Sequence, residues 1–384
     1  MIYLDNAATS YPKAPGVADG VATHIRTVSG NAGRSSYKDS ITSSTVLFET
    51  RELISTLFGL KSSDNIIFTL NATHALNIVI LGSIKREENI LISPFEHNSV
   101  LRPLSHLVVE KKIKLHRMSF DNNFNIDLET FEKSLIEKQI DKVIMTACSN
   151  VTGTILPFKE LALISQKHNI PFILDASQYM GYIPIDFTDI PVSAVCFPGH
   201  KGLLGPAGTG ILYFSDEFKF NSLYYGGTGS NSSSIIQPTF SPDMYESGTA
   251  NISGIYGLKI ALEYLEKEGL DKIRSHRVEM INQLAKELSE IEEIDIQSNL
   301  DIKRQIGVFS ITSKGISASE LTYWFDKNDI AVRMGLHCAP ETHKFLHTFD
   351  EGGTVRLSPG YFTTPEDIEK TINKLKEEVY VFNR

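Results

Sequence analysis

The sequence predicts an α/β protein in which a large domain, built on a mixed but mostly parallel sheet, is followed by a smaller α+β domain. Between about residues 66 and 214, short apolar runs rich in β-forming residues alternate with helix-like segments. Strands spaced by helices form parallel sheets that are covered on both faces. After about residue 255 the alternation ends, and long helical segments precede a few short strands.

The expected strands of the large domain are short and apolar, and they span 66–70, 88–93, 142–147, 171–174, 192–197 and 209–214. Helices are expected between them at 97–111 and 158–168, together with one that follows residues 71–74 and ends at 84. The Gly-rich stretch 205–210 precedes a strand instead of opening a helix. It is therefore interpreted as a turn and not as a dinucleotide-binding loop.

The C-terminal part has helical stretches over 255–291 and short strands at 306–311 and 330–333. Between these strands, Ser317 and Glu320 have the spacing of a capping box and predict the start of a helix. Thr364 and Pro365 suit the cap and first position of the last helix. We therefore expect a large domain over 16–254. A small domain formed by 1–15 and 255–384 would carry the loop around Cys338.

Composition and charge exclude several classes of protein. The chain has 384 residues, 41% of them hydrophobic, and a net charge of −9, so a disordered or fibrous chain is excluded. An acidic chain lacks the net positive charge that attracts nucleic acid or an anionic membrane. We expect a cytoplasmic protein for three reasons: its three cysteines cannot all pair, it has no signal peptide, and it has no apolar segment long enough to cross a bilayer.

Polar side chains follow the expected strands at the points where these strands end, namely Thr73, His74, His97, Asn150, Asp175, Gln178, His200 and Lys201. Ligands of α/β sheets bind beyond the carboxyl ends of the strands. Thr73 and His74 open a helix whose free N–H groups suit an anion. Pyridoxal phosphate needs a lysine amine, a carboxylate beside its pyridine nitrogen and a phosphate site, so this set of residues suits that cofactor.

With these residues in place, the sequence resembles the class V aminotransferase family of pyridoxal-phosphate enzymes, and within it the group of short-loop cysteine desulfurases and selenocysteine lyases. The matching segments lie in order along nearly the whole chain, at 3–9, 71–74, 96–98, 149–154, 175–178, 199–201, 246–249, 333–339 and 354–356. The resemblance implies fold type I of the pyridoxal-phosphate-dependent transferases and a homodimer.

The resemblance also implies roles for individual residues at the cofactor. Lys201 would join the cofactor aldehyde and later move protons, Asp175 would pair with the pyridinium, and His97 would stack on the ring. The other cofactor contacts would come from Thr73, His74, Asn150, Gln178 and His200, and from Thr249 of the second subunit.

The same resemblance assigns the substrate chemistry. Arg356 would bind the carboxylate of L-cysteine as a bidentate fork, with Arg333 and Asn150 also at the substrate. Cys338 would take the substrate sulfur as a persulfide and leave L-alanine, its thiolate responding to neighbours such as His337. The segment from Cys338 to Arg356 is short, which resembles the group that passes sulfur to a dedicated acceptor protein.

Some features leave other interpretations open. Relatives usually have Ser or Thr where this chain has Pro198, and the lost hydrogen bond should weaken cofactor binding about tenfold at most. Asp175 could instead cap a helix, and Cys338 could be a surface thiol. A metal site at His337, Cys338 and His343 is disfavoured because the spacing is poor and a fourth ligand is missing, so no metal is expected.

Three other functions compete with the desulfurase. A selenocysteine lyase or another β-lyase shares the fold, and an aminotransferase would cycle the cofactor to its amine form. A non-catalytic assembly partner would retain only the scaffold. The complete set of Lys201, Asp175, His97 and Arg356 argues against this last possibility.

Overall fold

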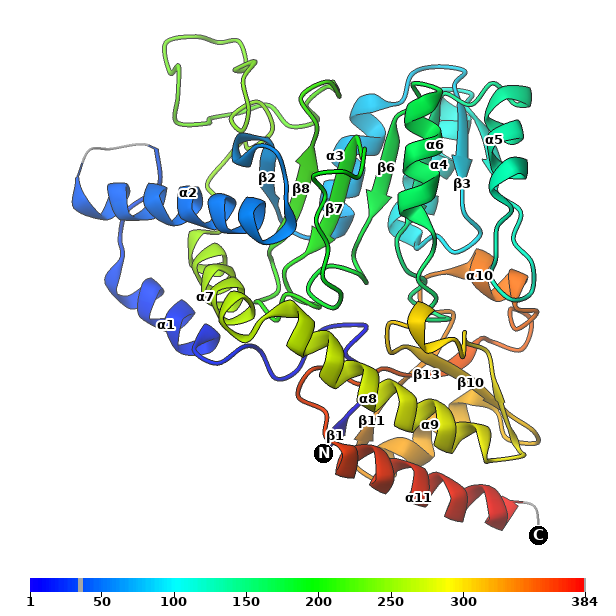
Figure 1. Ribbon diagram of the computed structural model, residues 1–384. Coiled ribbons are helices and arrows are strands. Elements are labelled where there is room, and N and C mark those ends of the chain that lie inside the picture. The colour runs from blue at the N-terminus through cyan, green and yellow to red at the C-terminus, as the bar shows by residue number, and fades with distance from the viewer. Residues whose placement is uncertain (34–36, 383–384) are drawn as a thin grey trace.

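The structure, a computed structural model, describes residues 1–33 and 37–382 (Figure 1). It confirms the expected α/β class, because its largest layer is a seven-stranded sheet of order β2-β8-β7-β6-β5-β3-β4 in which four of the six pairings are parallel. The strands of this sheet are β2 (Ile66–Thr69), β3 (Asn89–Ile92), β4 (Lys114–Arg117), β5 (Lys142–Thr146), β6 (Phe172–Asp175), β7 (Ala194–Pro198) and β8 (Gly210–Phe214).

Strand β8 runs against both of its neighbours, β2 and β7. The turn that joins β7 to β8 contains no helix. Parallel neighbours need a long crossover connection, so a direct connection of this kind can only return antiparallel. The expected turn at 205–210 thus reverses the chain at the edge of the sheet next to β2.

Helices cover both faces of the sheet, as alternation along the strands requires. On one face, α3 (Ala72–Ser83) and α4 (Asn98–Glu110) pack on side chains such as Ile144 and Ile173. The other face is covered by α2 (Lys38–Phe58), α5 (Leu128–Glu137) and α6 (Phe158–Lys167). These helices pack on the neighbouring residues of the same strands, including Val143 and Phe172. A short η1 turn (Ser63–Asn65) precedes β2.

The smaller part lies beneath the large sheet in Figure 1 and is built on an antiparallel sheet of order β12-β13-β10-β9. Its elements are α8 (Leu270–Ser289), β9 (Ile294–Ile296), η2 (Ile302–Arg304), β10 (Phe309–Ser313), α9 (Ala318–Lys327), β11 (Ile330–Ala331), β12 (Arg333–Gly335), α10 (Pro340–Phe345), β13 (Thr354–Leu357) and α11 (Pro365–Phe382). The expected capping box is present at the start of α9.

The N-terminal part of the chain contacts segments that come much later in the sequence. Strand β1 (Ile2–Tyr3) pairs with β11, so the N-terminus lies on the smaller part. Helix α7 (Ile252–Glu268) packs against α1 (Val17–Thr27) and α2. The expected domain boundary between residues 254 and 255 falls inside α7. The division into a large domain over 16–254 and a small domain over 1–15 and 255–384 stays a prediction. None of the helices in residues 1–33 and 37–382 is long and apolar enough to cross a membrane.

Candidate active site

A cavity of about 210 Å³ lies where the carboxyl ends of the parallel strands meet the smaller part of the molecule. The sequence-predicted residues that line it are Thr73, His97, Asn150, Asp175, Gln178, His200, Lys201, Arg333 and Arg356. Asp175 is the last residue of β6, and Lys201 follows β7. Arg333 and Arg356 come from β12 and β13, so both parts of the chain build this cavity.

Burial shifts the pKa values of the lysine and the aspartate of the cavity. Desolvation lowers the pKa of Lys201 to about 8, although Asp175 favours the charged amine. Burial raises the pKa of Asp175, whose Oδ1 accepts a hydrogen bond from the Ser177 N–H at 2.9 Å. A buried carboxylate is stabilised by a cationic partner. The cavity thus contains an amine that is easily deprotonated and a carboxylate that favours a bound cation.

Two histidines of the cavity are uncharged at neutral pH. Burial, assisted by the Lys201 cation, lowers the pKa of both His97 and His200 to about 4. His97 caps α4, with Nδ1 accepting from the Ser99 N–H at 3.1 Å. A neutral imidazole that accepts at Nδ1 has its hydrogen on Nε2, which assigns the tautomer of His97.

Arg356 is only 1% exposed, and its charge is compensated by a residue from the N-terminus. Its Nη2 donates to Asp5 Oδ1 at 2.8 Å, and its Nη1 donates to the backbone oxygen of Asn150 at 3.1 Å. Its Nε has no partner within the described part of the chain. The guanidinium therefore retains donors with which it could bind a carboxylate. No pattern in the sequence indicates Asp5 as its partner.

The N-terminal segment closes one side of the cavity through Ala7 and Ala8. The Ala7 carbonyl accepts from Gln178 Nε2 at 2.9 Å, and Lys13 Nζ donates to the His200 carbonyl at 3.0 Å. These residues were not among the sequence-predicted set. The signal that could have indicated them is the run of small residues around Ala7, because small side chains let the backbone approach other groups closely.

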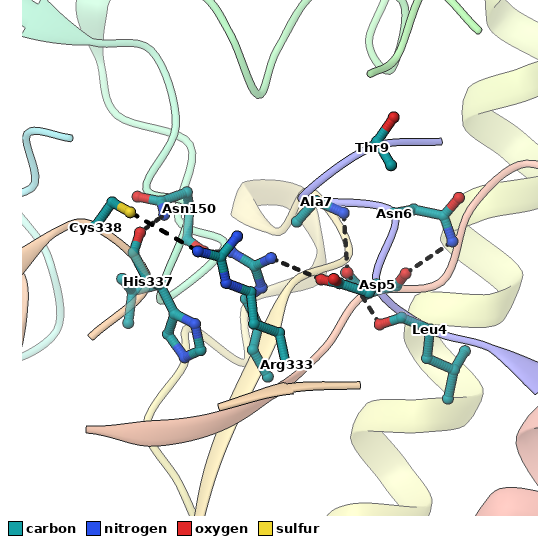
Figure 2. A network of polar contacts seen from close by, with 12 residues as sticks. Leu4, Asp5, Asn6, Ala7, Thr9, Asn150, Arg333, His337 and Cys338 are labelled. Carbon is teal, nitrogen blue, oxygen red and sulfur yellow. Dashed lines mark hydrogen bonds and ion pairs between the residues drawn. The ribbon is translucent and has the colours of Figure 1, made fainter. Parts of the chain in front are cut away.

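Cys338 does not line the cavity but lies beside it, with its Sγ 3.7 Å from Arg333 Nη2 (Figure 2). The thiol is half-buried, unlike the buried thiols of Cys148 and Cys196. The neighbouring His337 ring lies 3.0 Å from Thr354 Oγ1, and burial lowers its pKa to about 2. His337 therefore supplies no positive charge to the thiol, contrary to the expectation from its position. Arg333 places a cation there instead.

Besides Cys338, two predicted residues do not line this cavity. His74 and Thr249 line a second cavity of about 480 Å³. The Nδ1 of His74 accepts from the Leu70 N–H at 3.2 Å, and its ring packs edge-on against Tyr224. Within one chain, neither residue lines the first cavity, although His74 lies just beyond the end of β2. Pro198, by contrast, lines the first cavity as the last residue of β7.

The polar groups of the first cavity include donors and acceptors that need partners. Gln178 Oε1 and Arg356 Nε are buried and unpartnered among the residues described. Ala72 and Thr73 line the cavity at the start of α3, where the first turn leaves backbone N–H groups unused by the helix. Within residues 1–33 and 37–382, no group of His, Cys, Asp and Glu is arranged to hold a metal ion.

The chain belongs to the class V aminotransferases, because the model of the family described as "Aminotransferase class-V" matches residues 2–371. Among its relatives, the "probable cysteine desulfurase" of Borreliella burgdorferi is 31% identical over 99% of this chain and 92% of its own length. That of Pyrococcus abyssi is 30% identical over 99% and 94%.

A solved structure agrees with these relatives. The apo structure of the cysteine desulfurase from Thermococcus onnurineus NA1 has a TM-score of 0.92 at 29% identity, and the match covers 99% of this chain and 94% of that one. The resemblance found in the sequence is thus confirmed for both family and fold.

Proposed function

We propose that this protein is a pyridoxal-phosphate-dependent L-cysteine desulfurase that releases L-alanine and forms a persulfide on Cys338. The observation that carries the proposal is one cavity lined by Lys201, Asp175 and Arg356, with the Cys338 thiol beside it. The names of the relatives, cysteine desulfurases, support the choice of L-cysteine as substrate.

The residues of the cavity fit this cofactor. The N–H groups at the start of α3 suit its phosphate, and the buried Asp175 carboxylate suits a protonated pyridine nitrogen. The unpartnered Gln178 Oε1 can take part in a hydrogen bond at the ring, and the neutral His97 ring can pack on its face without adding charge. When bound, pyridoxal phosphate supplies an electron sink for the negative charge that develops at the substrate α-carbon.

The chain's own residues then bind the amino acid and move its protons. Arg356 is buried and already fixed by Asp5 and Asn150, so it can hold the substrate carboxylate in one orientation. Lys201 can exchange a proton near neutral pH because its pKa is lowered to about 8. With the carboxylate bound at Arg356, the substrate side chain can extend toward Arg333 and Cys338.

The sulfur transfer balances without another reactant. The Cys338 sulfur, as thiolate, bonds to the substrate sulfur while the Cβ–S bond of the substrate breaks. The electron pair of that bond stays with Cβ, which takes up a proton and becomes the methyl group of L-alanine. Arg333, 3.7 Å from Sγ, places a positive charge beside the sulfur that carries negative charge in this step.

The proposal is tested by loading the purified protein with pyridoxal phosphate and measuring L-alanine formed from L-cysteine. Cys338→Ala should abolish this activity, whereas Cys196→Ala, which alters a buried thiol of the sheet, should retain it. Full activity in Cys338→Ala would overturn the persulfide step. L-Selenocysteine assayed in parallel separates the alternative: alanine formed only from selenocysteine, and retained in Cys338→Ala, would assign a selenocysteine lyase.

We further propose a homodimer formed through the surface around the second cavity. Large apolar side chains are exposed on the segments that line or adjoin it, namely Phe48, Leu70, Tyr224, Tyr225, Ile235, Ile236 and Phe240. A second copy would cover them and could bring its Thr249 to the phosphate site. Light scattering should give twice the chain mass, and a monomer at micromolar concentration would contradict the proposal.

The sulfur acceptor is proposed to be a separate protein. Cys338 is half-buried and lies in a short loop, so a persulfide on it can be reached by a partner that docks beside the loop. Addition of a matching acceptor protein should accelerate alanine formation. If neither an acceptor protein nor a small thiol accelerates turnover, the proposal of a separate sulfur acceptor is contradicted.

A further inference from the structure

We propose that Asn150 is a positioning residue for Cys338, and that its side-chain amide holds the cysteine loop (residues 336–339) in place beside the cavity. The role expected from the sequence was contact with cofactor and substrate. The structure adds a direct contact with the loop, and this inference uses the proposed function only for the role of the thiol.

Two successive carbonyl groups of the cysteine loop are held by the large domain. Asn150 Nδ2 donates to the His337 carbonyl at 2.7 Å (Figure 2). The backbone N–H of Asn98, at the start of α4, donates to the Cys338 carbonyl, also at 2.7 Å. Asn150 itself lines the cavity and Asn98 follows His97, which also lines it, so the loop is fixed from the cavity side.

The backbone of the loop needs such support. His337 has φ 47° and Cys338 has φ 58°, and both are non-glycine residues in the left-handed region. That region is unfavourable for side chains with a Cβ, and two such residues in succession persist only where their surroundings hold them. The contacts at the two carbonyl groups therefore help to determine the direction in which the Cys338 side chain leaves the backbone.

Asn150 can serve the loop and the cavity together. It is buried, and its own carbonyl accepts from Arg356 Nη1 at 3.1 Å, so its backbone is fixed by the residue proposed to bind the substrate carboxylate. A side-chain amide has two N–H donors and one carbonyl acceptor. One N–H is used by His337, which leaves the others for a ligand. Asn150 thus connects the substrate site to the residue that would receive the sulfur.

The other contacts of the loop do not replace this one. The Ala339 N–H donates to the Leu336 carbonyl at 2.8 Å and closes the turn over His337 and Cys338. The His337 ring bonds with Thr354, and Arg333 contacts the Cys338 sulfur. None of these three contacts involves the His337 carbonyl, which the Asn150 amide holds. Loss of the Asn150 amide should therefore loosen the peptide between His337 and Cys338 while the two ends of the loop remain attached. An accurately placed sulfur is needed for transfer, since small displacements of reacting atoms slow reactions strongly.

The test measures the loop itself in the full chain loaded with pyridoxal phosphate. Cys338 is alkylated with iodoacetamide, and its peptide is quantified by mass spectrometry. Cys148 and Cys196 are at most 1% exposed and should not react in the folded protein. Because one hydrogen bond is lost, Asn150→Ala should raise the alkylation rate about threefold to tenfold. Asn98→Ala, which keeps the backbone donor, is the matched control and should leave the rate unchanged.

Amide hydrogen exchange of the loop peptide provides a second measurement that does not depend on the charge of the thiol. Asn150→Asp keeps the shape of the side chain but removes the N–H donor, and it serves if the alanine variant does not fold. Exchange should accelerate in the loop and stay unchanged in β6. Wild-type rates of exchange in a folded Asn150→Asp variant, or of alkylation in Asn150→Ala, would overturn the inference. Neither readout requires turnover, so failure of the desulfurase proposal would be seen separately.

Discussion

Replacement of Arg356 by lysine tests how the substrate carboxylate is bound. The variant keeps the positive charge opposite Asp5, so the buried carboxylate–cation pair is retained. It loses the planar guanidinium. In the wild-type protein this group donates to Asp5 and to Asn150 and has an unpartnered Nε. A lysine ammonium is a single point donor and cannot bind a carboxylate in the bidentate mode.

The magnitude follows from the lost contact. A hydrogen bond between charged groups contributes about 1.5–3 kcal/mol, so one lost bond should raise the KM for L-cysteine about tenfold to a hundredfold. The turnover number should fall less, because Lys201 and Cys338 are unchanged. The assay is initial-rate alanine formation over a range of L-cysteine concentrations.

A matched control is available at the surface. Arg117→Lys changes an arginine whose side chain is 47% exposed and pairs with Glu341 at 2.9 Å. Neither residue lines the first cavity, and a pair with an exposed member contributes little, so both constants should stay unchanged. A KM for Arg356→Lys that stays within about twofold of the wild-type value would refute carboxylate binding by Arg356, since the predicted loss is at least about tenfold.

Two further predictions concern titration. The pKa of Lys201 is lowered to about 8, and only the neutral amine can react with an aldehyde, so the rate of pyridoxal phosphate incorporation should rise with pH to a plateau above about pH 8. A pH-independent rate of appearance of the visible absorption band would contradict this. Burial raises the pKa of Glu96 to about 8 from 4.5, so its carboxyl is protonated in the folded protein and ionised in the unfolded chain at pH 7. The contribution of this carboxyl group to the free energy of unfolding is fully present below about pH 4.5 and is lost as the pH rises to about 8. The free energy of unfolding in urea should therefore fall over this range relative to Glu96→Gln, by a few kcal/mol; parallel pH profiles of the two proteins would exclude the effect.

The strand-end rule was the most informative part of the sequence. Asp175 and Lys201 follow apolar runs that became β6 and β7, and parallel strands bring their carboxyl ends to one edge of the sheet. Local patterns also predicted the capping box of α9. These features depend on spacing within a few residues, or on a rule that holds for parallel sheets in general.

Features that depend on distant pairing could not be predicted in this way. The Asp5–Arg356 contact joins residues 351 positions apart, and it depends on the N-terminal segment pairing with β11 and, at Asp5, with Ser358 beyond the end of β13. Strand β4 was missed because Lys114–Arg117 is a polar edge strand without an apolar pattern. His74 follows Thr73 directly, yet the two line different cavities, because successive residues of a helix point in different directions.

The Cys338 peptide after a single exposure to L-cysteine provides the most direct test. The protein, loaded with pyridoxal phosphate and free of added thiols, is mixed with L-cysteine, quenched, digested and analysed by mass spectrometry, with L-alanine measured in the same sample. The peptide should gain the mass of one sulfur atom in proportion to the alanine released, and Lys201→Ala should show neither product. Alanine released while the Cys338 peptide stays unmodified would contradict the proposed sulfur transfer.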